Sequence, residues 1–181
     1  MQRDAIRNAK IFMLGYLALR YTAFLMTQRS RLSTELSGVA GEYFVAGELS
    51  RRGFIASITL RNTRGVDILA AGGDATRSVG IQVKTNQGSG KGWVLNKKAE
   101  SLENDGLFYV FVNLNGLDTA PSYHVVSSAV VAEYCRRTHR EWLEAPGRGG
   151  HQRMDSNIRK FWDRDDKWKD RWDVLGLEEA V

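Results

Sequence analysis

The sequence predicts an α/β domain that begins at about residue 32, where one helix leads into three strands. Three observations predict this order. A capped helical pattern covers residues 34–52, three short apolar runs lie between residues 54 and 85, and a continuous apolar run spans residues 107–114. Short apolar runs bounded by turn residues are typical of strands. With 181 residues, of which 43% are hydrophobic, the chain is expected to form one main domain.

The first predicted helix has clear signals at both ends. Ser33 or Thr34 can cap its start, and it is expected to run to about Arg52 and stop at Gly53. Its apolar residues fall near helical spacing, which predicts one buried stripe. The residues of that stripe are Leu32, Leu36, Val39, Tyr43, Ala46 and Leu49.

Two glutamates on this helix are expected to differ in environment. Glu42 lies at the edge of the apolar stripe, whereas Glu48 is expected to point to solvent. A carboxylate at a core-facing edge is costly unless something pairs with it. Glu42 is therefore a candidate site residue, and a salt bridge to Arg61 or Arg64 is an equal alternative.

Three strands are predicted next, at residues 54–60, 65–71 and 79–85. Gly72-Gly73-Asp74 marks a hairpin turn between the last two strands. A glycine-rich loop follows at residues 87–92. It lacks the first glycine and the final Ser or Thr of a Walker loop. It is therefore either a flexible connection or a mobile loop that contacts DNA.

The second half of the chain continues with mixed elements. A short helix is predicted at residues 96–104, buried strands at 107–114 and 123–126, and a helix from Ser127 or Ser128 to about Trp142.

The last segment, from Ser156 to about Leu177, combines aromatic and charged residues. Helical spacing of its aromatic and aliphatic residues favours packing against the sheet. Stacking of nucleic-acid bases on Trp162 or Trp168 is the alternative. The residues near helical spacing are Ile158, Phe161, Trp168, Trp172 and Leu175.

The net charge of +5 hides an uneven distribution. Residues 1–31 carry six Lys or Arg and one Asp, so the remaining residues sum to zero. Within them, residues 51–98 hold nine bases and two acids, whereas the flanking ranges are net acidic. The basic block surrounds the strands at 65–85. Because phosphate binding needs local positive potential, this block indicates a phosphate-binding region better than the overall charge does.

The strongest chemical signal lies in the strands at 65–71 and 79–85. Side chains alternate faces along a strand, so Gln82 and Lys84 share one face. Asp67 is the one acid in the preceding strand. A carboxylate, a carboxamide and an ammonium that converge at a sheet edge are typical of a site for a hard metal ion and a phosphate.

The motifs in this order resemble the PD-(D/E)xK nuclease superfamily, which has the restriction-endonuclease-like fold. The resemblance rests on Gly41-Glu42 in the first helix, Gly65-Val66-Asp67-Ile68 in the second strand and Gln82-Val83-Lys84 in the third. It covers about residues 33–130. It implies an αβββαβ core with a mixed central sheet flanked by helices.

The resemblance also implies metal-assisted hydrolysis of phosphodiester bonds in DNA. Mg²⁺ (or Mn²⁺) would be bound by Asp67, with help from Glu42, the Gln82 amide oxygen and the Val83 carbonyl. Lys84 would orient the attacking water or hold the phosphate. The chain departs from the superfamily pattern because Gln82 stands where an acid is usual, and a carboxamide adds no charge to the metal site.

A set of basic residues would follow the DNA backbone, with solvated surface charge as the alternative for each: Arg51, Arg52, Arg61, Arg64, Lys91, Lys97 and Lys98. Cleavage of both strands by so small a domain would imply a homodimer. Two other functions stay open: a nuclease-like module that binds nucleic acid without cutting it, and a protein-interaction domain.

The chain is expected to divide into an N-terminal extension (1–31), a nuclease-like core (32–145) and a C-terminal extension packed on the core (146–181). The apolar run at 11–26 is short for a membrane span and contains Arg20, so a membrane partner is not expected. It reads as a leader or a loosely packed helix, with a weak anchor as the alternative. Cys135 is the single cysteine, which excludes an internal disulfide and fits the reducing cytoplasm.

Overall fold

The computed structural model describes residues 32–60 and 65–177. The predictions for residues 1–31, Arg61 and Arg64 therefore lie outside the described residues. From Ser33 onward the chain forms one compact unit. Its elements, in chain order, are α2 (Thr34–Arg51), β1 (Ile55–Ile58), β2 (Ile68–Ala71), β3 (Ser78–Asn86), β4 (Gly92–Asn96), the 3₁₀ turn η1 (Lys97–Glu100), β5 (Leu107–Asn113), β6 (Ser122–Ser127), α3 (Ser128–Glu144), η2 (Arg148–Gly150), β7 (Ile158–Trp162) and η3 (Trp172–Leu175).

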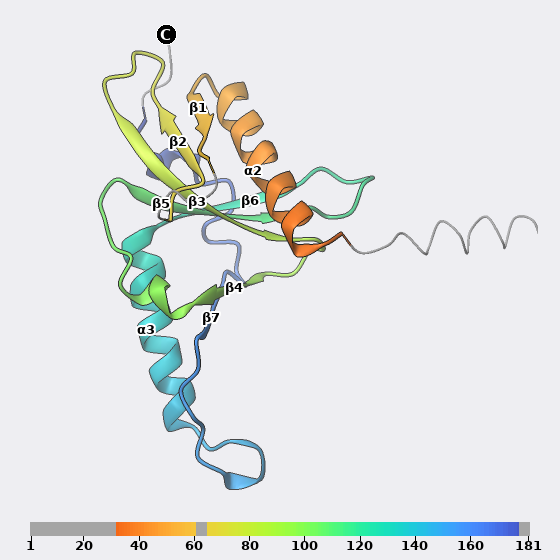
Figure 1. Cartoon of the computed structure of the whole chain (residues 1–181), viewed down its shortest axis with the longest axis vertical. Coiled ribbons are helices and arrows are strands. Elements are labelled where there is room, and N and C mark those ends of the chain that lie inside the picture. Colours follow the sequence, from red (N-terminus) through yellow and green to blue (C-terminus); the bar gives the residue numbers. More distant parts are fainter. Residues whose placement is uncertain (1–31, 61–64, 178–181) are drawn as a thin grey trace, which may run out of the picture. The chain divides into compact units, whose positions relative to one another are not determined.

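A five-stranded mixed sheet forms the centre of this unit, as predicted (Figure 1). Its strand order is β1-β2-β3-β5-β6; β3 and β5 run parallel and the other pairs are antiparallel. Parallel neighbours need a crossover connection. Here the crossover consists of β4 and the single turn η1, so the helix predicted at residues 96–104 is much shorter than expected.

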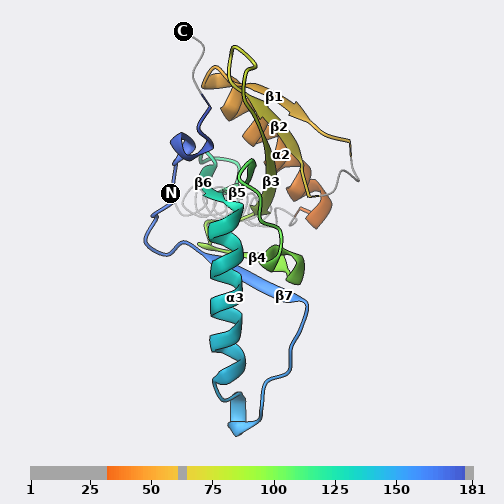
Figure 2. The same ribbon diagram turned by 90° about the vertical axis from the view of Figure 1, so that its left-hand side faces the viewer.

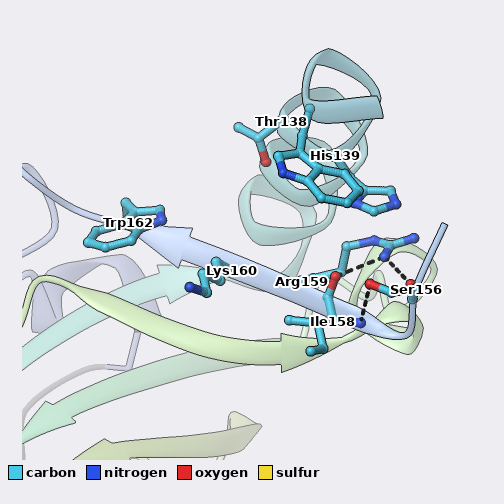
Figure 3. Close-up of a pocket in the computed structure, with 8 residues that line it drawn as sticks. Thr138, His139, Ser156, Ile158, Arg159, Lys160 and Trp162 are labelled. Atoms are coloured by element: carbon cyan, nitrogen blue, oxygen red, sulfur yellow. Dashed lines mark hydrogen bonds between the residues drawn. The ribbon is translucent and has the colours of Figure 1, made fainter. Parts of the chain in front are cut away.

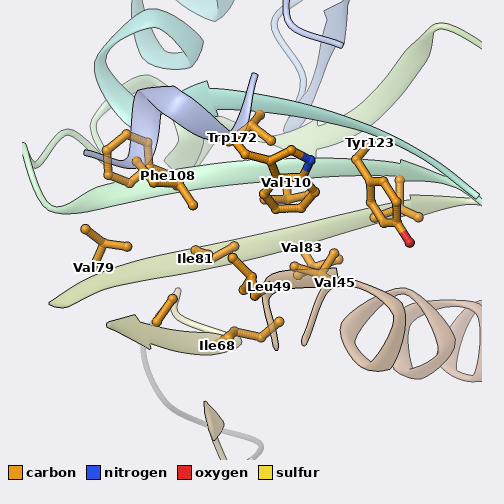
Figure 4. Close-up of a cluster of buried hydrophobic side chains, with 14 of the residues drawn as sticks. Val45, Leu49, Ile68, Val79, Ile81, Val83, Phe108, Val110, Tyr123 and Trp172 are labelled. Atoms are coloured by element: carbon orange, nitrogen blue, oxygen red, sulfur yellow. The ribbon is translucent and has the colours of Figure 1, made fainter. Parts of the chain in front are cut away.

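Two apolar cores cover the two faces of the central sheet. The first lies against α2 and η3 and includes Leu49, Ile81 and Val110 (Figure 4). The second lies against β4, β7 and α3 and includes Trp93 and Phe111. Figure 2 shows α3 and β7 beside each other. Successive side chains of β3 and β5 therefore point alternately to the α2 side and to the α3 side of the sheet.

The apolar stripe predicted for α2 is correct at Leu49 and Ala46, which pack in the first core, and wrong at most other positions. The residues that face the sheet are Ser37, Gly41, Val45 and Leu49, spaced by four. Leu36 and Tyr43 are instead 59% and 67% exposed. At Gly41, α2 lies so close to β3 that a larger side chain does not fit there.

The expectation that Glu48 points to solvent is also wrong. Its carboxylate accepts hydrogen bonds from Arg51 and Arg52, at 2.9 Å from the Nε of each, and it is largely covered. The two guanidinium groups lower the pKa of Glu48 against the opposing effect of burial.

The apolar residues of the C-terminal segment have helical spacing, but the segment does not form an α-helix. Residues 158–162 form β7, which pairs antiparallel with β4 in a second, two-stranded sheet. Phe161 faces the second core, whereas Trp172 and Leu175 in η3 join the first. Packing on the sheet was expected correctly, but through a strand and a 3₁₀ turn. Across residues 32–60 and 65–177, no helix has the length and apolar character needed to cross a bilayer.

Candidate active site

Asp67 lies directly before β2 and is tied to β3 by two hydrogen bonds. Its backbone N–H donates to the Ile81 carbonyl at 2.8 Å. Its carboxylate Oδ2 accepts from the backbone N–H of Val83 at 2.7 Å. The β2–β3 register pairs Ile68 with Ile81, so its continuation by one residue sets Asp67 opposite Gln82.

The polar residues of β3 share the face of the sheet that lies away from α2. Ile81 and Val83 enter the first core, so Gln82 and Lys84 point to the other side. Asp67 is on that side too, because Ile68 next to it faces the first core. The structure thus brings Asp67, Gln82 and Lys84 to one place, as the alternation indicated.

A cavity of about 620 Å³ opens beside these residues. The crossover between β3 and β5 forms its far wall, and both Gln82 and Lys84 contribute to its lining. The full set of lining residues is Gly65, Gln82, Lys84, Leu95, Asn96, Lys98, Ala99, Leu102 and Tyr109. The cavity is large enough for a phosphodiester group and its neighbours.

Two opposing effects act on the pKa of Lys84. Burial lowers its pKa, because the charged ammonium loses contact with water. The charges of Asp67 and, to a smaller extent, Glu42 act in the opposite direction. Two carboxylates from separate elements, Asp67 and Glu42, therefore favour the charged form of this lysine.

Glu42 follows Gly41, the point where α2 approaches β3 very closely. A Cβ atom at Gly41 would lie 1.9 Å from the Oγ1 of Thr85. Thr85 follows Lys84 in β3, and its buried hydroxyl has no hydrogen-bond partner among the residues that the structure describes. The glycine sets the separation of helix and strand, and thereby the position of the neighbouring Glu42.

Tyr109 is a site residue that the sequence reading missed. It lies beside Gln82 in the parallel β3–β5 register, is almost fully buried and lines the cavity. Burial raises its pKa, and the charges of Cys135 and Asp67 add to the effect. Nothing in the apolar run at 107–114 marked it, because a tyrosine there is an ordinary core residue.

The oxygen donors around Asp67 fit a hard divalent ion. One carboxylate oxygen of Asp67 is used by Val83, which leaves the other for a metal. Backbone N–H and C=O of one residue lie on the same edge of a strand, so the Val83 carbonyl faces the same edge as its N–H. The Gln82 and Glu42 side chains would add oxygen donors, and oxygen is the ligand atom that Mg²⁺ prefers. Between residues 32 and 177, apart from 61–64, no group of three or more His, Cys, Asp and Glu could hold a metal.

The basic residues predicted to follow DNA are placed differently from one another. Lys98 lines the cavity. Lys91 pairs with Asp166 at 2.7 Å, and Lys97 pairs with Asp155 at 2.8 Å. Arg51 and Arg52 bind Glu48 at the far end of α2, roughly 15 Å along the helix from Gly41 at 1.5 Å per residue.

A buried histidine and aspartate form a second polar cluster, which the sequence gave no signal for. The Nδ1 of His124 lies 2.7 Å from Asp163 Oδ2, and both side chains are almost fully buried. The Asp163 carboxylate also accepts from the backbone N–H groups of Lys167 and Trp168 at 2.9 Å. These bonds fix the turn after β7 to β6, which is a structural role.

No family model matches the chain, and no curated protein matches it. Two solved structures are similar in overall chain path. A bacterial homing endonuclease has a TM-score of 0.47 at 14% identity, covering 79% of this chain and 92% of its own. A Holliday junction resolvase from the archaeal hyperthermophile Archaeoglobus fulgidus has a TM-score of 0.46 at 14% identity, covering 79% of this chain and 98% of its own.

Proposed function

We propose that this protein is a Mg²⁺-dependent nuclease that hydrolyses phosphodiester bonds of DNA. The observation that supports it most is the position of Lys84. It shares a face with Asp67 and Gln82, it lines the cavity, and the charges of Asp67 and Glu42 both act on it. Perturbed ionisable groups in a cavity are typical of active sites.

The donors described above would hold the metal: Asp67, Glu42, the Gln82 amide oxygen and the Val83 carbonyl. When bound, the ion would lower the pKa of a water molecule and neutralise charge on the phosphate. Asp67 would be ready to bind it without rearrangement, because the Val83 N–H fixes its carboxylate.

Lys84 would act on the phosphate directly. In a partly buried site its ammonium interacts with a phosphate oxygen more strongly than a surface lysine does. Lys98, on the opposite wall of the same cavity, would bind a neighbouring phosphate. The two lysines would hold the DNA backbone across the cavity.

A second function is favoured by the small number of acids. Gln82 carries no charge, and the described residues around Asp67 include no group of three metal-binding side chains of the His, Cys, Asp and Glu types. A site with this donor set can bind nucleic acid without turnover. The alternative is therefore a nuclease-like module that only binds DNA.

Cleavage assays separate the two functions. Full-length protein is incubated with plasmid, branched and single-stranded DNA in Mg²⁺, Mn²⁺ or EDTA. We expect cleavage with either metal, none in EDTA, and none by Lys84→Ala. Lys169→Ala, which removes an exposed lysine outside the cavity, is the matched control and should cut normally. Salt-sensitive binding without cleavage would establish the binding module, and absence of both would favour a protein-interaction domain.

A further inference from the structure

A second pocket, distinct from the cavity at Lys84, lies between α3 and β7 (Figure 3). Its volume is about 440 Å³. Its lining combines two tryptophans, two cationic residues and a histidine, and it includes no carboxylate. The lining residues are Thr138, His139, Trp142, Ser156, Ile158, Arg159, Lys160 and Trp162.

Among the described residues, two carboxylates bond to this lining, and both are paired. Glu100 accepts from the Nε of Arg159. Asp155 accepts from Lys97 at 2.8 Å and from His139 at 2.7 Å, and these bonds hold the pKa of Asp155 well below its ordinary value. Arg159 also reaches it, at 3.3 Å. In the described part of the chain, the Lys160 ammonium forms no ion pair or hydrogen bond. The pocket thus keeps one uncompensated positive charge.

Two indole rings stand at this pocket from opposite elements. Trp142 of α3 is 42% exposed and Trp162 of β7 is 39% exposed. The Trp162 ring rests on Gly92 of β4, where a Cβ atom would lie 2.5 Å from it. The guanidinium of Arg164 lies 5.1 Å from the centre of the same ring. Trp162 is therefore fixed in place, partly open to solvent and close to positive charge.

We infer that this pocket binds an unpaired segment of single-stranded DNA, with a base stacked on Trp162 and an adjoining phosphate on Lys160. Aromatic rings combined with cations are the usual means of holding single strands, because every base has a π-face and every linkage a negative charge. An acidic peptide would use the cations but would leave the indole rings without a stacking partner.

The pocket lies near the cavity of the proposed nuclease site. The role of the pocket in binding a DNA substrate therefore rests on the proposed function. Asn96 lines the cavity at Lys84 and is paired across the small sheet with Ile158, which lines the second pocket. Each hollow is thus lined by one member of a cross-strand pair in the small sheet. A DNA substrate with an unpaired segment next to the scissile bond would contact both.

The test measures binding in EDTA, so that it does not depend on cleavage. Fluorescence anisotropy of a labelled oligothymidine of about 12 nucleotides is compared for full-length wild type, Trp162→Phe and Trp162→Leu. We expect Phe to keep most of the affinity and Leu to lose about tenfold, since stacking contributes about 1–3 kcal/mol per base. A merely structural tryptophan would tolerate both substitutions equally, and that result would overturn the inference.

Charge and substrate form are tested in parallel. Lys160→Gln should weaken binding several-fold and lower its salt dependence, whereas Lys169→Gln should leave both nearly unchanged. A duplex of the same length that binds as tightly as the single strand would also overturn the inference. Because binding is measured in EDTA and cleavage in Mg²⁺, loss of cleavage and loss of single-strand binding are distinguishable outcomes.

Discussion

The Asp67 carboxylate accepts a 2.7 Å hydrogen bond from the backbone N–H of Val83, across the start of the β2–β3 pair. The bond replaces the strand partner that β2 would supply to Val83 if it began two residues earlier. It uses one carboxylate oxygen and fixes the direction of the other. The same contact thus closes a gap in the sheet and orients the proposed metal ligand.

This dual role predicts different outcomes for two substitutions of Asp67. Asp67→Asn keeps an oxygen that can accept from Val83, so we expect stability near wild type and no cleavage. Asp67→Ala leaves a buried N–H without a partner and should cost about 1–3 kcal/mol of unfolding free energy. Urea unfolding curves measure both. Equal stability of the Ala variant and wild type would contradict the structural role of the bond.

Gln82→Glu should strengthen metal binding, because it adds an anionic oxygen next to Asp67. In EDTA the extra charge lies near Asp67 and Glu42, so we expect a lower melting temperature that Mg²⁺ restores. A Mg²⁺ titration of melting temperature, together with cleavage, reports the change. Gln152→Glu, in an exposed loop, is the control and should show no Mg²⁺ response. A Gln82→Glu protein that is indifferent to Mg²⁺ would argue against a metal at this position.

Gly41→Ala should separate α2 from β3. The new methyl group would meet the Thr85 hydroxyl, and overpacking of this kind costs about 1–3 kcal/mol. Gly47→Ala is a matched control on the same helix, since a Cβ there has nothing within 4 Å. It should stabilise the protein by roughly 0.5–1 kcal/mol, because alanine loses less backbone freedom than glycine in a helix. Similar effects of the two substitutions would show that the α2–β3 contact is not tight.

Asp163→Ala should be among the most destabilising substitutions in the chain. It leaves His124 and two backbone N–H groups without their acceptor in a buried place, which we expect to cost about 3–5 kcal/mol. Asp165→Ala, two residues away and exposed, should change stability little. Thermal unfolding of the two variants measures the difference in stability. A small loss of stability in Asp163→Ala would show that the His124–Asp163 cluster contributes little to the fold.

Cys135 should be unreactive in the folded protein. Burial raises the pKa of its thiol to about 11, so almost no thiolate forms at about pH 8. Because the folded state favours the neutral thiol, its contribution to stability is present below the unfolded pKa and is lost as pH rises through the folded pKa. Reaction with Ellman's reagent should be slow until guanidinium is added. Rapid reaction of native protein would show that α3 opens readily.

The sequence predicted the parts of the fold that depend on near neighbours. Ser33 caps α2, the hairpin turns at Gly72, and β5 is buried along its whole length, as its pattern indicated. The shared face of Gln82 and Lys84 on β3 was also predictable, because alternation along a strand is a local property. Partners far apart in sequence were not. The strand character of residues 158–162 depends on β4, about sixty residues earlier, and that pairing left no local pattern.

By itself, the sequence determined that Gln82 and Lys84 share a face and that Asp67 precedes a neighbouring strand, because side chains must alternate along an extended backbone. Only the tertiary structure decided which side of α2 meets the sheet, and hence where Glu42 lies. The spacing of apolar residues favoured Leu36 and Tyr43, yet close packing against Thr85 requires a glycine. Periodicity ranks residues by how apolar they are, whereas two surfaces at van der Waals contact select residues by size and shape.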